Sequence, residues 1–327
     1  MAHLSVRVLG PFQVHLDGEP VSGFASDKVR ALLVYLAMSP DRPHRREALA
    51  GLLWPEFPEP SARTNLRNAL ANLRQVISDR DAEPPYLQIS WQTLQFNGQS
   101  DYWLDAAAFE GLVATTPPDS ETLEQAVALA RGLLMEGFTL ADAAPFEEWL
   151  LLRRERFGRQ LVGALDSLAA IYEQRGAHEQ ALAYARRRVE MEPWQDGGQR
   201  QLMRLLALSG QRNAALAHYE HYRQRLAAEL GVGPSEETQE TFKLLLEGRL
   251  PPAPQVAVRV REREPRVVGE CPYRGLAAFR EEDAPFFFGR ERFAEGLFEA
   301  LHERPLVAVI VGSSGSGKSS VVSAGLL

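Results

Sequence analysis

Short stretches near the N-terminus alternate between apolar and polar residues, a pattern typical of β-strands. Leu4–Val8 and Phe12–Leu16 alternate in this way, and Asp17-Gly18 supplies a turn after the second stretch. The alternation returns on both sides of Ser90–Thr93, within Tyr86–Phe96. We therefore expect two N-terminal strands and, further along the chain, a β-hairpin.

Three stretches between these strands have their apolar residues at helical spacing. A helix that begins at Ser26 or Asp27 is expected to end before Pro40. A second is expected over about Arg45–Leu53 and a third over Ser61–Ile77. Strands, three helices and a closing hairpin, in this order, predict a winged helix-turn-helix domain over residues 1–98.

The third helix is the candidate for contact with DNA. Its apolar residues, such as Leu66 and Leu70, would face inward and leave basic and amide side chains outward. Such side chains bind base edges, and arginine also neutralises phosphate. The predicted DNA-binding residues are Arg63, Thr64, Arg67, Asn68, Ala71, Asn72, Arg74 and Gln75, with Trp91 of the hairpin. A face that is merely solvated remains the alternative.

The overall charge opposes nucleic-acid binding, but its distribution along the chain does not. The net charge is −7, whereas residues 42–80 contain seven basic and four acidic residues. Local charge decides where phosphate can dock. The single cysteine, Cys271, excludes an internal disulfide, and no apolar run approaches a membrane span. The N-terminus lacks the pattern of a signal peptide, so we expect a cytoplasmic protein without a membrane partner.

Residues 99–248 are predicted to be helical and to contain a repeat. At an offset of 34 residues, Gly176 aligns with Gly210, and Ala181-Leu182-Ala183 aligns with Ala215-Leu216-Ala217. This period is typical of tetratricopeptide helix pairs, which stack into an α-solenoid. The concave face of such a stack can hold a peptide or another subunit, or the repeats can serve packing alone. The pattern leaves both options open.

Residues 249–270, rich in proline and arginine, are interpreted as a linker, and residues 271–327 as the start of an α/β P-loop NTPase domain. The apolar run Leu306–Val311 predicts a buried strand, and a phosphate-binding loop follows it. Its predicted nucleotide-binding residues are Gly312, Ser313, Ser314, Gly315, Ser316, Gly317, Lys318, Ser319 and Ser320. We expect ATP or another NTP there, with Ser319 as a Mg²⁺ ligand. The sequence stops at Leu327, so we expect no unaided hydrolysis and leave enzymatic activity open.

Seven short motifs are spread along the first 245 or so residues, namely Leu9–Phe12, Lys28–Leu33, Leu52–Pro55, Asn65–Arg74, Asp105–Phe109, Gln201–Met203 and Ala228–Pro234. Together they resemble the motifs of regulators of the antibiotic regulatory protein (SARP) type. The resemblance implies an OmpR-like winged helix joined to a bacterial transcriptional activator domain. It also implies binding to double-stranded promoter DNA as a homodimer and recruitment of RNA polymerase. Asn72 departs from the pattern, since many relatives have a basic residue there, so their base preference does not transfer.

A second resemblance covers the C-terminal segment. Cys271–Phe279, Phe287–Glu291 and the phosphate-binding loop are similar to STAND NTPases of the novel, WD-repeat-associated kind. The resemblance implies that Arg290 lies near the nucleotide, and that nucleotide binding controls a switch in the full-length protein.

The fold class predicted from the sequence is mainly α with a small β part. A winged helix-turn-helix is followed by a tetratricopeptide-like α-solenoid and by the truncated start of a P-loop NTPase domain. The predicted function is a DNA-binding transcriptional activator. Two alternatives are a signalling STAND NTPase with a scaffold at its front, and a tetratricopeptide adaptor whose winged helix binds protein.

Overall fold

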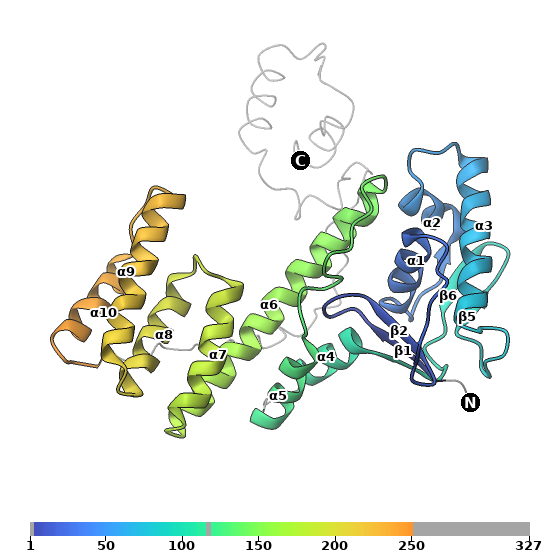
Figure 1. The fold of residues 1–327 in the computed structure, drawn as a ribbon. Coiled ribbons are helices and arrows are strands. Elements are labelled where there is room, and N and C mark those ends of the chain that lie inside the picture. The colour runs from blue at the N-terminus through green and yellow to red at the C-terminus, as the bar shows by residue number, and fades with distance from the viewer. Residues whose placement is uncertain (1–2, 116–118, 251–327) are drawn as a thin grey trace, which may run out of the picture. The chain divides into compact units, whose positions relative to one another are not determined.

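The computed structural model describes residues 3–115 and 119–250, and it confirms the mainly helical class with a few strands (Figure 1). A four-stranded sheet lies near the N-terminus, in the order β3 (Glu19–Pro20), β2 (Gln13–Leu16), β1 (Leu4–Arg7) and β7 (Tyr102–Leu104). β1 and β2 pair antiparallel, as the two alternating stretches predict. β7 pairs with β1 in parallel, which places a strand from beyond the hairpin beside the first strand of the chain.

The three predicted helices are present. They are α1 (Asp27–Ala37), α2 (Arg46–Leu53) and α3 (Glu59–Val76). α3 begins two residues before the predicted Ser61 and includes Pro60 in its first turn. A proline is tolerated there because the first N–H groups of a helix have no intrahelical partner.

The predicted hairpin is the larger part of a second, three-stranded sheet. β5 (Leu87–Ile89) pairs antiparallel with β6 (Thr93–Phe96), and β4 (His44–Arg45) adds to the other edge of β6. β4 directly precedes α2, so the sheet joins the hairpin to the helices. We call residues 87–96 the wing.

The rest of the described chain is helical (Figure 1). Its helices are α4 (Asp105–Val113), α5 (Ser120–Leu129), α6 (Ala144–Gln174), α7 (His178–Met191), α8 (Asp196–Leu208), α9 (Arg212–Glu229) and α10 (Glu236–Leu246). α6 to α9 pack in chain order. Gly176 and Gly210 follow α6 and α8 with φ of 73° and 75°, a left-handed conformation that glycine adopts without strain. The 34-residue period therefore coincides with the helix pairs α6–α7 and α8–α9.

One apolar core includes residues from the winged helix and from the helical part. Its buried side chains run from Leu4 to Leu168, and a second cluster runs from Ala169 to Leu245. Asp105, at the start of α4, is 1% exposed, and its carboxylate accepts the N–H groups of Val8 and Leu9 at 2.8–2.9 Å. The core is thus continuous across residue 98, and the predicted domain boundaries remain predictions.

None of the helices in residues 3–115 and 119–250 is long and apolar enough to cross a membrane. Nor do these residues contain a group of three or more His, Cys, Asp or Glu placed to hold a metal ion.

Candidate nucleic-acid interface

Four of the residues predicted to contact DNA lie on the open face of α3. Arg67, Asn68, Ala71 and Gln75 are all exposed. Among the described residues, Arg67, Asn68 and Gln75 have no side-chain hydrogen bond or ion pair. The opposite face of the helix, including Leu66 and Leu73, is buried in the core. The amphipathic spacing therefore leaves a row of polar side chains available for a ligand.

Other members of the predicted set are already engaged near the N-terminal end of α3. The Arg63 guanidinium lies 2.7 Å from a Glu47 carboxylate oxygen and 2.5 Å from one of Glu59. Thr64 donates its hydroxyl hydrogen to the backbone oxygen of Pro60, 3.0 Å away. These contacts hold both side chains against the protein while leaving them exposed.

Asn72 connects α3 to the loop before α1. Its Oδ1 accepts the N–H of Ala25 at 2.9 Å, and its Nδ2 donates to the carbonyl oxygen of Gly23 at 3.2 Å. Both ends of the amide are therefore bonded within the protein. A basic side chain at this position would not reproduce the pair of bonds, because it has no acceptor.

Arg74 connects α3 to the wing through a buried carboxylate. Its Nε donates to Oδ2 of Asp79 at 2.8 Å, and Oδ1 of Asp79 accepts the N–H of Leu87 at 2.9 Å. Asp79 is fully buried, whereas 32% of the Arg74 side chain is exposed. Arg74 thus supports the C-terminal end of α3, an arrangement that helix periodicity does not reveal.

Trp91 lies at the tip of the wing, and 85% of it is exposed. The turn around it is ordered by Ser90, whose Oγ accepts the N–H groups of Gln92 and Thr93 at 3.2 and 2.8 Å. Arg46 at the start of α2 donates from Nε to the Ser90 carbonyl oxygen at 3.0 Å. Burial lowers the pKa of the Arg46 guanidinium below its ordinary value. The wing tip is therefore fixed to α2 while its indole ring is left to solvent.

Sequence reasoning did not single out two arginines that the structure leaves exposed. Arg45 directly precedes α2, and Arg80 lies in the loop after α3. Neither forms an ion pair with another residue in the part of the chain that the structure describes. The sequence feature that included them was the excess of basic residues between positions 42 and 80. Such an excess does not show which side chains form ion pairs and which do not.

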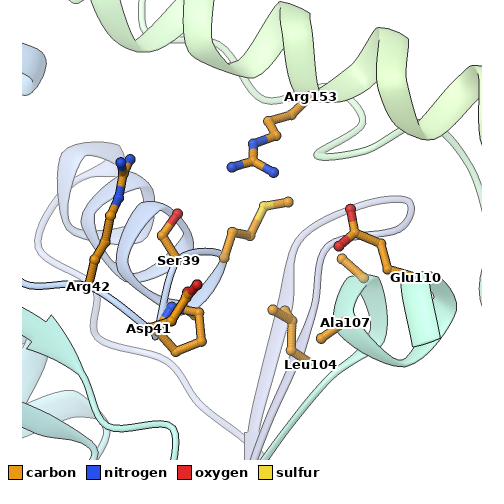
Figure 2. A pocket seen from close by; sticks show the side chains of 11 residues that line it. Ser39, Asp41, Arg42, Leu104, Ala107, Glu110 and Arg153 are labelled. Carbon is orange, nitrogen blue, oxygen red and sulfur yellow. The ribbon is translucent and has the colours of Figure 1, made fainter. Parts of the chain in front are cut away.

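A hollow of about 450 Å³ lies where the loop after α1 meets α4 and α6 (Figure 2). Figure 2 shows Arg153 of α6 on one side and Glu110 of α4 on another, with Asp41 and Arg42 on the loop. Two acidic and two basic side chains give the hollow no preference for a phosphate or for a cation. It lies apart from the exposed face of α3.

The predicted nucleotide-binding residues lie outside the described residues. These are the loop from Gly312 to Ser320, including the predicted Mg²⁺ ligand Ser319, and Arg290.

Comparison with protein families gives two matches along the chain. Residues 104–246 match the bacterial transcriptional activator domain, and residues 272–327 match the novel STAND NTPase 1 domain.

Individual relatives are regulatory proteins by name, and two of them are named as transcriptional regulators. The regulatory protein AfsR of Streptomyces coelicolor is 26% identical over 98% of this chain and 30% of its own length. MoaR1 of Mycobacterium tuberculosis is 26% identical over 73% of this chain and 78% of its own length. EmbR of the same species is 35% identical over 25% of this chain and 21% of its own length. This chain thus spans less than a third of AfsR.

A solved structure of Mycobacterium tuberculosis EmbR, in complex with a low-affinity phosphopeptide, has a similar fold. The TM-score is 0.57 at 22% sequence identity, and the alignment covers 77% of this chain and 67% of EmbR. At this identity the likeness concerns the fold.

Proposed function

We propose that this chain is a transcriptional regulator of the SARP type and that it activates transcription by binding duplex DNA through α3. The match of residues 104–246 to the bacterial transcriptional activator domain and the similarity to AfsR and MoaR1 support this proposal. The observation that supports this most is the open face of α3. Arg67, Asn68 and Gln75 are exposed there without partners among the described residues, and nothing in the described helical part covers them. These are the side-chain types that bind base edges.

The proposed complex places α3 in the major groove, which is wide enough for an α-helix. The wing, with Trp91 at its tip, would lie against the neighbouring backbone or in the minor groove. Arg45 and Arg80 are available for phosphate, whose contacts fix the position of a protein on the duplex. Arg74 and Asn72 would support α3 from inside the protein.

The resemblance to regulators of the SARP type also suggests partners, which we propose for this chain. They are double-stranded promoter DNA, RNA polymerase and a second copy of the chain. For the longer protein we propose nucleotide control by ATP and Mg²⁺ at the loop from Gly312 to Ser320, which is supported by the STAND NTPase match. A cytoplasmic location fits these partners.

Duplex binding tests this proposal directly. The affinity of the chain for a pool of promoter fragments is measured by fluorescence anisotropy at several salt concentrations. The double substitution Arg67→Ala and Gln75→Ala should weaken binding at least about tenfold, because each bidentate base contact contributes about 1–3 kcal/mol of discrimination. The control is Arg186→Ala, which removes an exposed arginine on α7.

Equal affinities of the double variant and the unchanged chain would contradict the proposal. That result would favour an adaptor whose winged helix binds protein. Binding should also weaken steeply with salt, since each phosphate contact adds about 0.9 to the slope.

A further inference from the structure

We infer that the base preference of this protein is set by four residues of α3, namely Arg67, Asn68, Ala71 and Gln75, and that it selects a G·C pair flanked on one side by A·T pairs. This inference rests on the proposed function and specifies the DNA that the site accepts. It depends on which side chains of α3 are exposed without partners and which are held by the protein.

The four residues occupy the centre of the exposed face. With about 100° per residue, Ala71 and Gln75 lie near its midline, and Arg67 and Asn68 lie on either side. Arg67 and Gln75 are separated by eight residues, which at 1.5 Å per residue is about 12 Å along the helix axis. At 3.4 Å per base pair, a helix lying along the groove spans three to four base-pair steps.

The chemistry of each side chain then suggests its base. Arginine binds O6 and N7 of guanine with two hydrogen bonds, whereas asparagine and glutamine bind N6 and N7 of adenine. The methyl group of alanine contacts the methyl group of thymine. Arg67 therefore selects guanine, Asn68 and Gln75 select adenine, and Ala71 favours thymine.

The polar residues at the margins of this face are held by the protein and do not select bases. Both ends of the Asn72 amide are bonded to the loop at residues 23–25. Arg74 is bonded to the buried Asp79 and Arg63 to two glutamates. Asn72 and Arg74 are positioning residues, because they fix the orientation of α3 from inside.

The charge at the N-terminal end of α3 explains why the middle of the helix enters the groove. Glu56 and Glu59 lie at this end, and Arg63 is shared between Glu59 and Glu47. Three carboxylates against one guanidinium would repel the phosphate backbone. The first residue of α3 beyond this acidic end with an uncommitted cationic side chain is Arg67.

The test is selection of bound sequences from a random duplex pool by the full chain and its variants. The unchanged chain should enrich a G·C pair next to A·T pairs within about four base pairs. Arg67→Ala should reduce the preference for the guanine by about tenfold. Asn68→Ala and Gln75→Ala should each reduce the preference for one adenine by about the same factor. Arg74→Ala and Asn72→Ala should keep the preference of the unchanged chain even where affinity falls.

Thermal unfolding of each variant, followed by circular dichroism, separates a loss of fold from a loss of contact. The inference is overturned if guanine preference persists in folded Arg67→Ala, or if Arg74→Ala or Asn72→Ala selects different bases. Duplex binding without any base preference in the unchanged chain would also overturn it while leaving the proposed function intact. Failure to bind any duplex would overturn both.

Discussion

At the scale of single residues, one buried carboxylate determines how α3 meets the wing. Asp79 follows α3 and accepts hydrogen bonds from Arg74 and from the N–H of Leu87, at 2.8 and 2.9 Å. Asp79 is fully buried, and burying a carboxylate costs free energy unless its oxygens accept hydrogen bonds of this kind. The same residue therefore fixes the C-terminal end of α3 and the start of the first wing strand.

Asp79→Ala should lower the free energy of unfolding by about 2–3 kcal/mol, because it leaves the Leu87 N–H without its acceptor and Arg74 without its ion-pair partner. Urea denaturation followed by tryptophan fluorescence measures the change. The matched control is Asp81→Ala, at an exposed aspartate two residues further on. A loss no larger than that of Asp81→Ala would show that the carboxylate does not hold the two elements together.

His44 provides a prediction on pH. It is 8% exposed, its Nε2 is buried without a hydrogen-bond partner among the described residues, and its ring lies 5.0 Å from that of Tyr35. Burial first, and then the charge of Arg42, lower the pKa of His44 from 6.5, although the Ser39 backbone and Asp41 oppose them. The folded protein therefore binds this proton less readily than the unfolded chain.

A lowered pKa contributes stability that is present above pH 6.5 and is lost as the pH falls towards the pKa of the folded state. In His44→Phe, which keeps an aromatic ring, this contribution is absent. As the pH falls below 6.5, the free energy of unfolding of the unchanged protein should therefore decrease relative to that of His44→Phe. Denaturation at a series of pH values measures it, and a constant difference would contradict the assignment.

At the scale of elements, the spacing of apolar residues was sufficient to predict the helices and the hairpin. α1, α2 and the wing appear close to their predicted positions, because each has several apolar residues at one period. β7 was not predicted, since Tyr102–Leu104 is too short for a period and becomes a strand by pairing with β1. β4, with two residues, is likewise defined by its partner β6. Long-range pairing of this kind leaves no local signal.

The same reason limits the prediction of the candidate site. Periodicity identified the exposed face of α3, including Arg67 and Asn68. It did not show that Asn72 is bonded to residues 23–25, almost fifty positions away, because the approach of that loop depends on the tertiary fold. The sequence thus predicts which side chains point outward, and the structure shows which of them are hydrogen-bonded to other parts of the protein.

Another prediction at this scale concerns Arg154 of α6. Its guanidinium donates to the carbonyl oxygens of Leu134, Met135 and Phe138 at 2.8, 2.6 and 2.9 Å. Arg154→Met should lower the free energy of unfolding by at least about 3 kcal/mol, because three hydrogen bonds from a charged donor are lost and each contributes about 1.5–3 kcal/mol. The methionine side chain keeps part of the packing. The neighbouring Arg153→Met is the control, because within residues 3–115 and 119–250 the side chain of Arg153 makes a cation–π contact with Trp149 and no hydrogen bond or ion pair. Similar losses in both variants would contradict this role.

At the scale of the whole molecule, the winged helix and the first helices behind it share one core. The ring of Tyr35 in α1 lies 4.9 Å from that of Trp149 in α6. The carboxylate of Asp105 accepts the N–H groups of Val8 and Leu9, which directly follow β1. Packed side chains therefore join the winged helix, which contains α3, to the residues that match the bacterial transcriptional activator domain. In the described chain no flexible linker separates them.

This shared core predicts how fragments behave. Residues 1–98 lack β7 and Asp105, so the β1 edge and the N–H groups of Val8 and Leu9 lose their partners. Residues 1–115 restore both. We expect the shorter fragment to melt without a cooperative transition. The longer fragment should melt cooperatively, at a lower temperature than the full chain. Differential scanning calorimetry measures both transitions. The two fragments differ in residues 99–115 alone. Equal melting midpoints would therefore mean that the winged helix is stable without the strand and the helix that follow it.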